Sequence, residues 1–253
     1  MKILFHERFL ERYSRDPAAE EGRLDGMLAM VRERYEVVVA EPADARDVLR
    51  VHSRRHFDEI RSERRIFPVA LLAAGAAVAA AESAMKGEPA FALLRPPGHH
   101  ASPDSCWGFC FFNNVAIALA RLLDHGDVRS AFVLDFDLHH GDGTQSAFAG
   151  DSRVRYSHPE APVRAAFVEA ARRELREASP FDMLAVSAGF DRFVEDWGGM
   201  LALDDYRALG TMARDAARER CRGRRFAVLE GGYNHERLGD CLAAFLDGFD
   251  DET

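Results

Sequence analysis

The chain has 253 residues, of which 47% are hydrophobic and 30% charged, and its formal net charge is -9. This balance fits one soluble α/β domain covering residues 1–253 and excludes a disordered or fibrous protein. The negative charge argues against a nucleic-acid partner and fits cationic substrates better, although mild acidity is also common in proteins that simply need to stay soluble.

Four cysteines are few for this length, and none belongs to a Cys-x-x-Cys pair. They predict free thiols in a reducing compartment. The N-terminus turns charged after residues 3–5, which does not fit a signal peptide. The longest apolar run, residues 69–81, is too short and too rich in alanine to cross a bilayer and predicts a buried helix. We therefore expect a cytoplasmic protein with no membrane partner.

Short β-rich runs alternate with amphipathic stretches along the chain. The predicted strands are residues 2–5, 36–40, 90–94, 131–137, 154–157, 182–187 and 226–230. The predicted helices are residues 19–34, 43–52, 56–62, 69–85, 114–123, 163–177, 205–221 and 238–249. This alternation predicts a single-domain α/β fold, with an open, mainly parallel sheet covered by helices on both faces.

Four of the predicted strands lead at once into polar segments that contain glycine, at residues 95–100, 135–143, 187–191 and 230–234. The carboxyl ends of parallel strands meet at one edge of the sheet, where α/β proteins bind their ligands. We therefore expect two histidines, an Asp/His cluster, a lone aspartate and a tyrosine to share one crevice.

A metal site is predicted from Asp137, His139 and Asp191. The first two are two residues apart on an extended segment, so both side chains point the same way. Two aspartates and one histidine leave an open position, which suits a catalytic Zn²⁺, although Fe²⁺ or Mn²⁺ would also fit such ligands. Taken alone, Asp191 reads as a helix N-cap and His139 as an ordinary buried histidine.

The doublet His99-His100 follows a Pro-Pro-Gly turn. Histidines beside spare carboxylates suggest carboxylate–imidazole pairs, and Asp135 and Asp142 are the candidate partners. Taken alone, the doublet reads as a chance feature of the surface.

Tyr233 follows two glycines in the last of the four segments. A phenol can donate a hydrogen bond to a developing oxyanion, although most tyrosines belong to a core or a rim.

Five segments in this order resemble the histone deacetylase family, within the larger arginase/deacetylase fold. They are Arg95-Pro96-Pro97-Gly98-His99-His100-Ala101, Gly108-Phe109-Cys110-Phe111-Phe112-Asn113-Asn114, Asp135-Phe136-Asp137-Leu138-His139-His140-Gly141-Asp142-Gly143-Thr144-Gln145, Ser187-Ala188-Gly189-Phe190-Asp191 and Gly231-Gly232-Tyr233-Asn234. The likeness extends from about His52 to about Asn234. Five ordered segments are far more specific than one motif.

The resemblance implies a role for each residue of the crevice. Asp137, His139 and Asp191 would bind Zn²⁺, and water and the substrate carbonyl would share the open position. Tyr233 would hydrogen-bond the oxyanion.

The same resemblance implies a different role for each of the two histidines. His100, paired with Asp142, would act as general base and then as general acid. His99, paired with Asp135, would give electrostatic support.

A structural K⁺ is also implied, held by backbone carbonyls of the segment that contains Asp135, Asp137 and His139 and by the hydroxyl of Ser157. The expected walls of an acyl-lysine tunnel are Gly108, Phe109 and Trp197.

The chain departs from the family pattern around the mouth of the tunnel. The segment after Gln145 is short and lacks the loop that supplies a second aromatic wall. Asp196-Trp197-Gly198-Gly199 stands where Asp-Pro-Leu-Gly-Gly is usual, and the N-terminal motif is reduced. The catalytic set therefore looks complete while the enclosure of the substrate looks altered, and a partner subunit could supply the missing wall.

The main hypothesis is a zinc-dependent amidohydrolase that removes an acyl group from acyl-lysine in peptides or proteins, or from a small acylated amine. An acetylpolyamine amidohydrolase is the alternative substrate class. A non-catalytic acyl-lysine-binding module is the alternative from another class, favoured by the missing wall. An arginase-like enzyme with two Mn²⁺ ions would need more carboxylate ligands than the strand ends offer. A homo-oligomer is compatible with all of these readings.

Overall fold

Seven strands form one sheet in the computed structural model of the chain, which describes residues 1–250, and every neighbouring pair in it is parallel. The strands are β1 (Lys2–Phe5), β2 (Glu36–Val39), β3 (Ala90–Ala92), β4 (Ala131–Asp135), β5 (Val154–Ser157), β6 (Met183–Ala188) and β7 (Arg225–Leu229). Their order across the sheet is β2-β1-β3-β7-β6-β4-β5. The predicted fold class is confirmed.

Nine α-helices connect the strands within the described part of the chain. They are α1 (Asp25–Arg34), α2 (Ala45–Val48), α3 (Arg54–Ser62), α4 (Phe67–Met85), α5 (Asn114–His125), α6 (Asp142–Ala147), α7 (Arg164–Glu177), α8 (Leu203–Cys221) and α9 (Leu238–Phe249). Two 3₁₀ turns, Glu7–Leu10 and Pro17–Ala19, follow β1.

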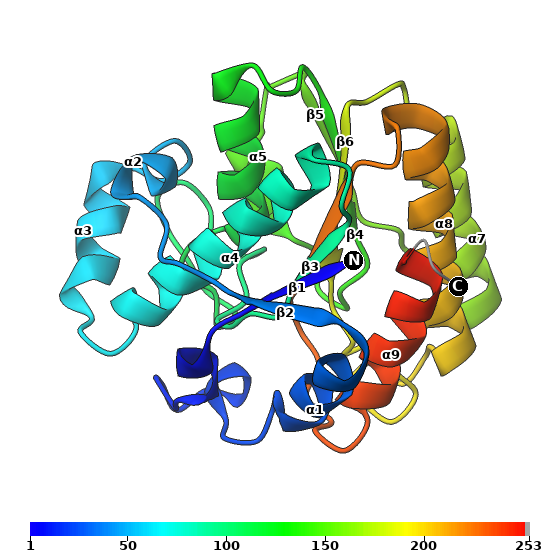
Figure 1. Ribbon diagram of the computed structural model, residues 1–253, viewed down its shortest axis with the longest axis horizontal. Coiled ribbons are helices and arrows are strands. Elements are labelled where there is room, and N and C mark those ends of the chain that lie inside the picture. Colours follow the sequence, from blue (N-terminus) through cyan, green and yellow to red (C-terminus); the bar gives the residue numbers. More distant parts are fainter. Residues whose placement is uncertain (251–253) are drawn as a thin grey trace.

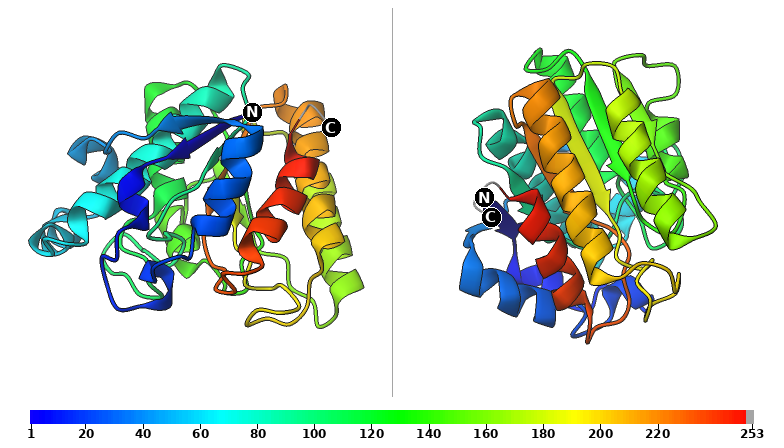
Figure 2. Two further views of the ribbon diagram at one scale, coloured as in Figure 1. Left: turned by 60° about the horizontal axis from the view of Figure 1, so that its bottom comes forward. Right: turned by 90° about the vertical axis from the view of Figure 1, so that its right-hand side faces the viewer.

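The helices cover both faces of the sheet (Figure 1). The α4 and α5 helices pack against each other and the sheet on one face, whereas α8 and α9 lie side by side on the other, with α1 against α9 and α7 against α8 (Figure 2). Most strand residues in the middle of the sheet are fully buried, since helices shield them from both sides.

The alanine-rich helix α4 is long and apolar enough to cross a membrane by length and composition, but 72% of its apolar window is buried inside the protein. Its small side chains let it lie close to neighbouring backbone: a Cβ at Gly75 would stand 1.9 Å from the carbonyl oxygen of Glu41. The predicted buried helix is therefore the core helix of one face.

The boundaries of several elements differ from the prediction. The strands β3 and β4 end two residues early, so Phe136 and Asp137 lie beyond the end of β4, although the N–H of Phe136 still donates to the oxygen of Ser187 at 3.2 Å. The first helix begins at Asp25, because Gly22 adopts a left-handed conformation with φ of 82° just before it. The short helix α6 was not predicted, since polar residues and glycine dominate it.

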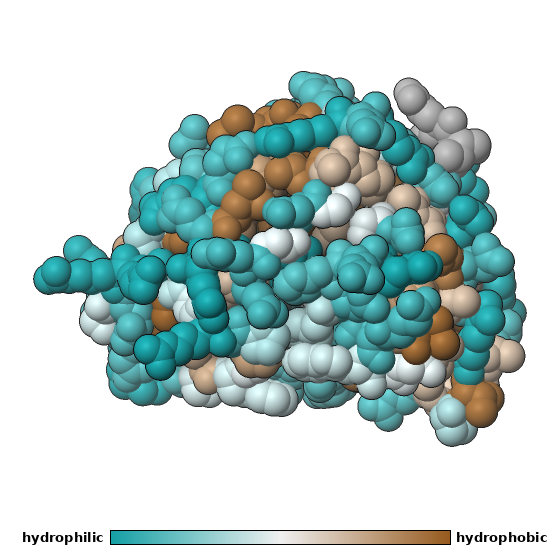
Figure 3. All heavy atoms as spheres, turned by 90° about the horizontal axis from the view of Figure 1, so that it is seen from below, coloured by the Kyte–Doolittle hydropathy of each residue, from teal (hydrophilic) through white to brown (hydrophobic). Residues whose placement is uncertain are grey.

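The carboxyl ends of the strands point toward the lower side of Figure 1. Viewed from that side (Figure 3), the surface is mostly hydrophilic, with hydrophobic patches toward its margins. The polar segments that follow β3, β4, β6 and β7 gather at this edge.

Candidate active site

One pocket at this edge receives side chains from three of the predicted segments and from the 107–109 loop. Its lining consists of Pro97, His99, His100, Trp107, Gly108, Phe109, His139, Trp197, Gly231 and Tyr233. The expected crevice therefore exists, and Asp191 of the fourth segment lies buried directly behind it, beside His139.

The predicted metal ligands lie close together. One potential ligand atom from each of Asp137, His139 and Asp191 falls within 4.8 Å of the other two. The Nδ1 of His139 lies 3.3 Å from Oδ1 of Asp137 and 3.2 Å from Oδ2 of Asp191. Both carboxylates are buried, whereas His139 is 41% exposed and borders the pocket. Of the three potential metal ligands, His139 therefore borders the pocket, and the two carboxylates lie behind it.

Backbone groups and glycines hold the two carboxylates in place. The N–H of Gly231 donates to Oδ2 of Asp137 at 2.7 Å, and the N–H of Leu138 donates to Oδ1 of Asp191 at 2.9 Å. A Cβ at Gly231 would lie 2.6 Å from an oxygen of each carboxylate, and one at Gly189 would lie 2.1 Å from Asp137. Only glycine fits at either position.

A divalent cation fits this arrangement. The Oδ2 of Asp191 is buried, and it shares its polar neighbour at 3.2 Å, the Nδ1 of His139, with Asp137. A buried carboxylate oxygen needs a donor or a cation, so this shared contact leaves a place for a cation. Two carboxylates and one imidazole with an open side toward a pocket are a donor set typical of catalytic zinc, and Fe²⁺ accepts the same ligands.

The charges of the trio also favour a cation. The hydrogen bonds to Asp137 and Asp191 raise the pKa of His139 to about 10. Burial raises the pKa of Asp191 to about 6, and the neighbouring Asp137 carboxylate acts in the same direction. The two carboxylates repel each other, so positive charge between them stabilises both.

The two predicted carboxylate–histidine pairs are present. The Nδ1 of His99 lies 3.1 Å from Asp135, and the Nδ1 of His100 lies 2.6 Å from Asp142. Both histidine side chains are 4% exposed. Tyr156, which the sequence interpretation did not single out, donates its hydroxyl to Asp135 at 3.0 Å. Each carboxylate thus fixes one ring nitrogen of its histidine.

The two histidines differ in electrostatics. Burial by itself lowers the pKa of His99, but the carboxylates of Asp137 and Asp135 outweigh it and raise this pKa well above its ordinary value. Burial lowers the pKa of His100, and the charge of His99 lowers it further, against the opposing effect of Asp142. Of the two, His100 is the one that favours the neutral form.

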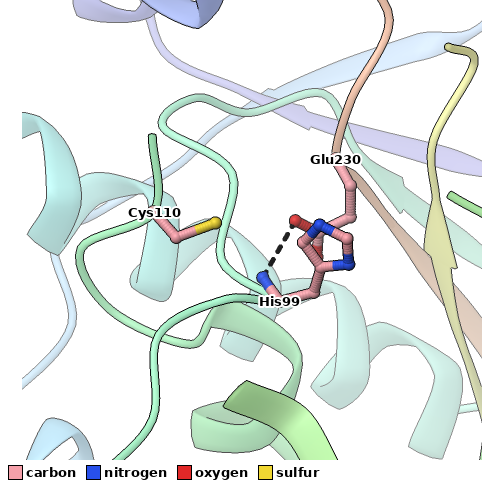
Figure 4. Close-up of side chains that lie close together, drawn as sticks. All are labelled: His99, Cys110 and Glu230. Atoms are coloured by element: carbon pink, nitrogen blue, oxygen red, sulfur yellow. Dashed lines mark hydrogen bonds between the residues drawn. The ribbon is translucent and has the colours of Figure 1, made fainter. Parts of the chain in front are cut away.

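A buried carboxylate behind His99 was missed. Glu230 is fully buried and its Oε2 accepts the backbone N–H groups of Gly98 and His99 at 2.7 and 3.2 Å. It lies with His99 and Cys110 in a second group of potential metal ligands (Figure 4). Burial raises the pKa of the Cys110 thiol well above its ordinary value, which disfavours a metal-binding thiolate. We therefore assign this group to support of the His99 loop; its only signal in the sequence is a glutamate at the end of a buried strand.

Aromatic side chains form the mouth of the pocket. The ring of Trp197 stacks on Tyr233 with centroids 3.8 Å apart, and Phe109 meets Tyr233 edge to face at 6.1 Å. Trp107, another residue not singled out, lies over His100 at 3.9 Å and donates to Asp142 at 2.9 Å. Both tryptophans are more than half exposed.

Local backbone geometry produces this mouth. Gly108 has φ of 57°, and a Cβ there would lie 2.3 Å from the ring of His100. Phe109 is also left-handed, with φ of 67°, an unusual conformation for a bulky residue and one often found at functional sites. The three predicted tunnel residues, Gly108, Phe109 and Trp197, all border the pocket.

Tyr233 is held by two further residues that were missed. The guanidinium carbon of Arg23 lies 5.4 Å from the centre of the Tyr233 ring. A carboxylate oxygen of Asp196 accepts the backbone N–H groups of Tyr233 and Asn234, each at 2.7 Å. Burial raises the pKa of Tyr233, so the phenol keeps its proton.

Two of the groups predicted to hold K⁺, the carbonyl of Asp137 and the hydroxyl of Ser157, have other partners. The side chain of Arg192 donates to backbone carbonyl oxygens of Phe136, Asp137 and Leu138, at 3.2, 3.0 and 3.3 Å. The hydroxyl of Ser157 lies 3.4 Å from Glu174. These two groups are therefore already engaged by protein side chains.

The segment after β5 is short, as the sequence indicates. Residues 158–163 alone join the end of β5 to the start of α7. The pocket therefore has no wall from a long loop at this position.

Comparison with known proteins agrees with the geometry. The Histone deacetylase domain family matches residues 18–158 and 157–249. A probable deacetylase of Archaeoglobus fulgidus is 33% identical over 323 aligned residues, covering 98% of this chain and 86% of the relative. A histone deacetylase-like amidohydrolase of Pseudomonas aeruginosa is 30% identical over 268 residues, covering 85% of this chain and 70% of the relative. The archaeal alignment is longer than this chain, so that relative contains segments that are absent here.

A solved structure, described as the crystal structure of the HDA15 HD domain, has the same fold. It superposes with a TM-score of 0.84 at 22% identity and covers 100% of this chain and 91% of that chain. The family match, the curated relatives and the shared fold lead to one conclusion: the chain belongs to the histone deacetylase family, whose members depend on a metal, and it is a deacetylase or amidohydrolase of that family.

Proposed function

We propose that this protein hydrolyses a linear acyl-amide, with Zn²⁺ held by Asp137, His139 and Asp191. One observation carries the proposal: Tyr233 and His100, which pairs with Asp142, border the same pocket as His139. When bound there, zinc supplies a Lewis acid that polarises the substrate carbonyl and acidifies water. Fe²⁺ in the same site would supply the same chemistry.

His100 carries out both proton transfers of the proposed reaction, and His99 supports it with charge. His100 takes a proton from the attacking water, because it is the histidine that favours the neutral form. Asp142 holds the Nδ1 of His100, so the Nε2 faces the reaction, and the same nitrogen later returns the proton to the leaving amine. His99 keeps a positive charge beside the site, which the carboxylates of Asp137 and Asp135 favour.

Tyr233 is proposed to donate its hydroxyl to the oxyanion as the carbonyl carbon becomes tetrahedral. Its raised pKa supports this role, since the phenol stays protonated at neutral pH. Stacking on Trp197 and the contact with Arg23 restrict the ring, so the donor is oriented before the substrate binds.

The proposed substrate class is acyl-lysine in peptides or proteins, or a small acylated amine. The short segment after β5 supports it, because an open mouth admits a residue attached to a chain. Acetylpolyamines are the second candidate: two exposed tryptophans at the mouth can hold a distal ammonium through cation–π contacts.

The four cysteines are free, which supports the proposed reducing, cytoplasmic location.

The central test replaces His100 by Ala and Tyr233 by Phe and measures deacylation of an acetyl-lysine reporter together with bound zinc. We expect His100→Ala to lower kcat by about 10²–10⁴-fold and Tyr233→Phe by about 10²–10³-fold, with zinc retained. Matched controls are His140→Ala, an exposed histidine of the same run that contacts Gln145, and Tyr13→Phe, a buried phenol outside the pocket. Full activity in either pocket variant would sink the mechanism.

A second measurement separates the substrate classes. The purified protein is offered an acetyl-lysine peptide and acetylputrescine at equal concentrations, with and without a chelator. Turnover of the peptide that the chelator abolishes supports the first class, and turnover of acetylputrescine alone supports the second. Binding of the peptide without turnover of either compound would instead identify a non-catalytic binding module.

A further inference from the structure

The loop that carries two of the proposed metal ligands is held by an arginine that lies outside the catalytic pocket. Arg192 follows the ligand Asp191 directly, and its side chain turns back onto the stretch that leaves β4. Its Nε and Nη2 atoms reach three consecutive carbonyl oxygens, those of residues 136, 137 and 138. The residue is 5% exposed.

The position of the guanidinium is fixed on its other sides. Its carbon atom lies 4.5 Å from the ring centre of Phe167, a fully buried residue of α7. The N–H groups of Met200 and Leu201 donate to the backbone oxygen of Arg192 at 3.0 and 2.7 Å, which anchors the residue at its base. Both ends of this long side chain are therefore restrained.

The surrounding charges require a cation at this place. Asp135, Asp137 and Asp191 are at most 1% exposed. The first two belong to the same stretch as the three carbonyl groups, and Asp191 accepts the N–H of Leu138 at 2.9 Å. Buried carboxylates that share a site repel one another unless positive charge lies nearby. A guanidinium carries one permanent positive charge and directed N–H donors. It therefore donates hydrogen bonds to the oxygens that a monovalent ion would otherwise coordinate, and it supplies the same charge.

The remaining groups leave little space for a free ion. The Nε2 of His158 lies 2.9 Å from the carbonyl oxygen of Asp137 and 3.3 Å from Nη2 of Arg192. The hydroxyl of Ser157 lies 3.4 Å from Glu174, which also binds Arg155 at 3.0 Å. A cation at the Asp137 oxygen would face nitrogen atoms on two sides.

We propose that Arg192 is a built-in monovalent cation, which takes the structural place predicted for K⁺ and makes this site independent of potassium. Arg192 is then a positioning residue, since it acts through the backbone that presents Asp137 and His139. The inference concerns the support of the metal ligands and does not depend on which substrate the pocket accepts.

The first experiment measures cation binding to the zinc-loaded wild-type protein. The protein is dialysed into tetramethylammonium chloride, whose cation is too large for the site, and then moved to KCl of equal ionic strength. We expect the melting temperature to change by no more than about 1 °C, whereas a site filled by K⁺ at about 100 times its dissociation constant would raise it by about 5–10 °C. Calorimetric titration with thallium(I), a K⁺ mimic, should detect no stoichiometric binding.

The second experiment removes the guanidinium. In Arg192→Ala the three carbonyl oxygens lose their donor, so we expect a lower melting temperature that KCl restores in part and tetramethylammonium chloride does not. Arg220→Ala is the matched control, because Arg220 also donates to two backbone carbonyls, those of Arg176 and Ala178, at 2.7 Å each. It should lose stability equally in both salts.

Stoichiometric thallium binding by the wild-type protein, or stabilisation by KCl of the size above, would overturn the proposal. So would a folded Arg192→Ala protein that ignores K⁺, since its oxygens would then not form a cation site. If the alanine variant does not fold in any salt, the two wild-type measurements decide the question. None of these readouts uses the hydrolytic reaction, so a failure of the proposed function would leave them interpretable.

Discussion

The base of the pocket and its mouth are built on different principles. At the base, Asp137 and Asp191 are at most 1% exposed, and backbone N–H groups and glycines fix their positions. At the mouth, Trp107 and Trp197 are 56% and 53% exposed and lie on loops. Sites whose ligands are locked by packing perform chemistry with little reorganisation, whereas exposed aromatic residues adjust to what they bind. We expect the base to set the reaction and the mouth to set the preference among substrates.

The largest effect is expected from a methyl group at the base. In Gly231→Ala the new Cβ would stand 2.6 Å from both carboxylates, so the ligands must separate. We expect the protein to lose its metal and the deacylase activity to fall by at least about 10³-fold. Metal content by mass spectrometry and turnover of the reporter test this. The control is Gly26→Ala on the exposed side of α1, where a Cβ would meet its nearest atoms at 3.7 and 3.9 Å. A variant that retains both metal and activity would contradict the rigid base.

Asp142 joins the two regions, because it accepts from both His100 and Trp107. Asp142→Asn keeps the size of the side chain but removes the charge that supports an imidazolium and fixes the tautomer of His100. We expect kcat to fall by about 10²-fold with little change in KM. Trp107→Phe removes only the other hydrogen bond and serves as the comparison. Equal losses in the two variants would show that Asp142 acts through the tryptophan.

Low pH is expected to lower the stability of the protein by protonating His52, which holds the segments of Ser102 and Asn113 on either side of the 107–109 loop of the mouth. Burial lowers the pKa of His52 to about 3; its Nε2 accepts the N–H of Asn113, and its Nδ1 lies 3.0 Å from the oxygen of Ser102. Because the folded pKa is depressed, the unfolded chain binds the extra proton. The stability from neutral His52 is complete above pH 6.5 and is lost as the pH falls toward 3.

The expected loss is about 2 kcal/mol between pH 7 and pH 5, or about 4–8 °C in melting temperature. His52→Gln can keep both hydrogen bonds without titrating, so its melting temperature should fall less over the same range. Parallel curves for the two proteins would rule out His52 as the sensitive group.

The smallest effect is expected at the mouth itself. Trp197→Ala removes the ring that stacks on Tyr233, and such a contact contributes about 0.5–1.5 kcal/mol. We expect kcat/KM to fall by about 2–10-fold, and by different factors for an acetyl-lysine peptide and acetylputrescine. Trp197→Phe should recover most of the loss. A fall of more than about 100-fold for every substrate would place Trp197 in the base rather than the mouth.

The base was predictable from the sequence and the mouth only in part. Asp137, His139 and Asp191 follow directly from strand ends, since parallel strands carry their carboxyl ends to one edge. Trp107 reaches His100 because residues 108 and 109 are both left-handed, and a phenylalanine gives no local signal of that conformation.

Arg192 shows a second limit of prediction from sequence. Its long side chain could have pointed to solvent, as most arginines do, and no local pattern reveals that it turns onto the stretch after β4 instead. Glu230 is similar, because a strand-end glutamate is interpreted as exposed until the loop that covers it is known. Family motifs identify residues that do chemistry, and they miss the groups that hold those residues in place.

The order of strands has a consequence for synthesis of the protein on the ribosome. The β7 strand joins β3 on one side to β6 on the other, yet it is the last strand to be made. Until residues 225–229 emerge, β3 and β6 each present an unpaired edge, which is a template for aggregation. The histidines after β3 and the ligands after β4 and β6 also belong to halves that β7 has yet to join. The nascent chain therefore acquires its catalytic pocket and closes its most vulnerable edges in the same final step.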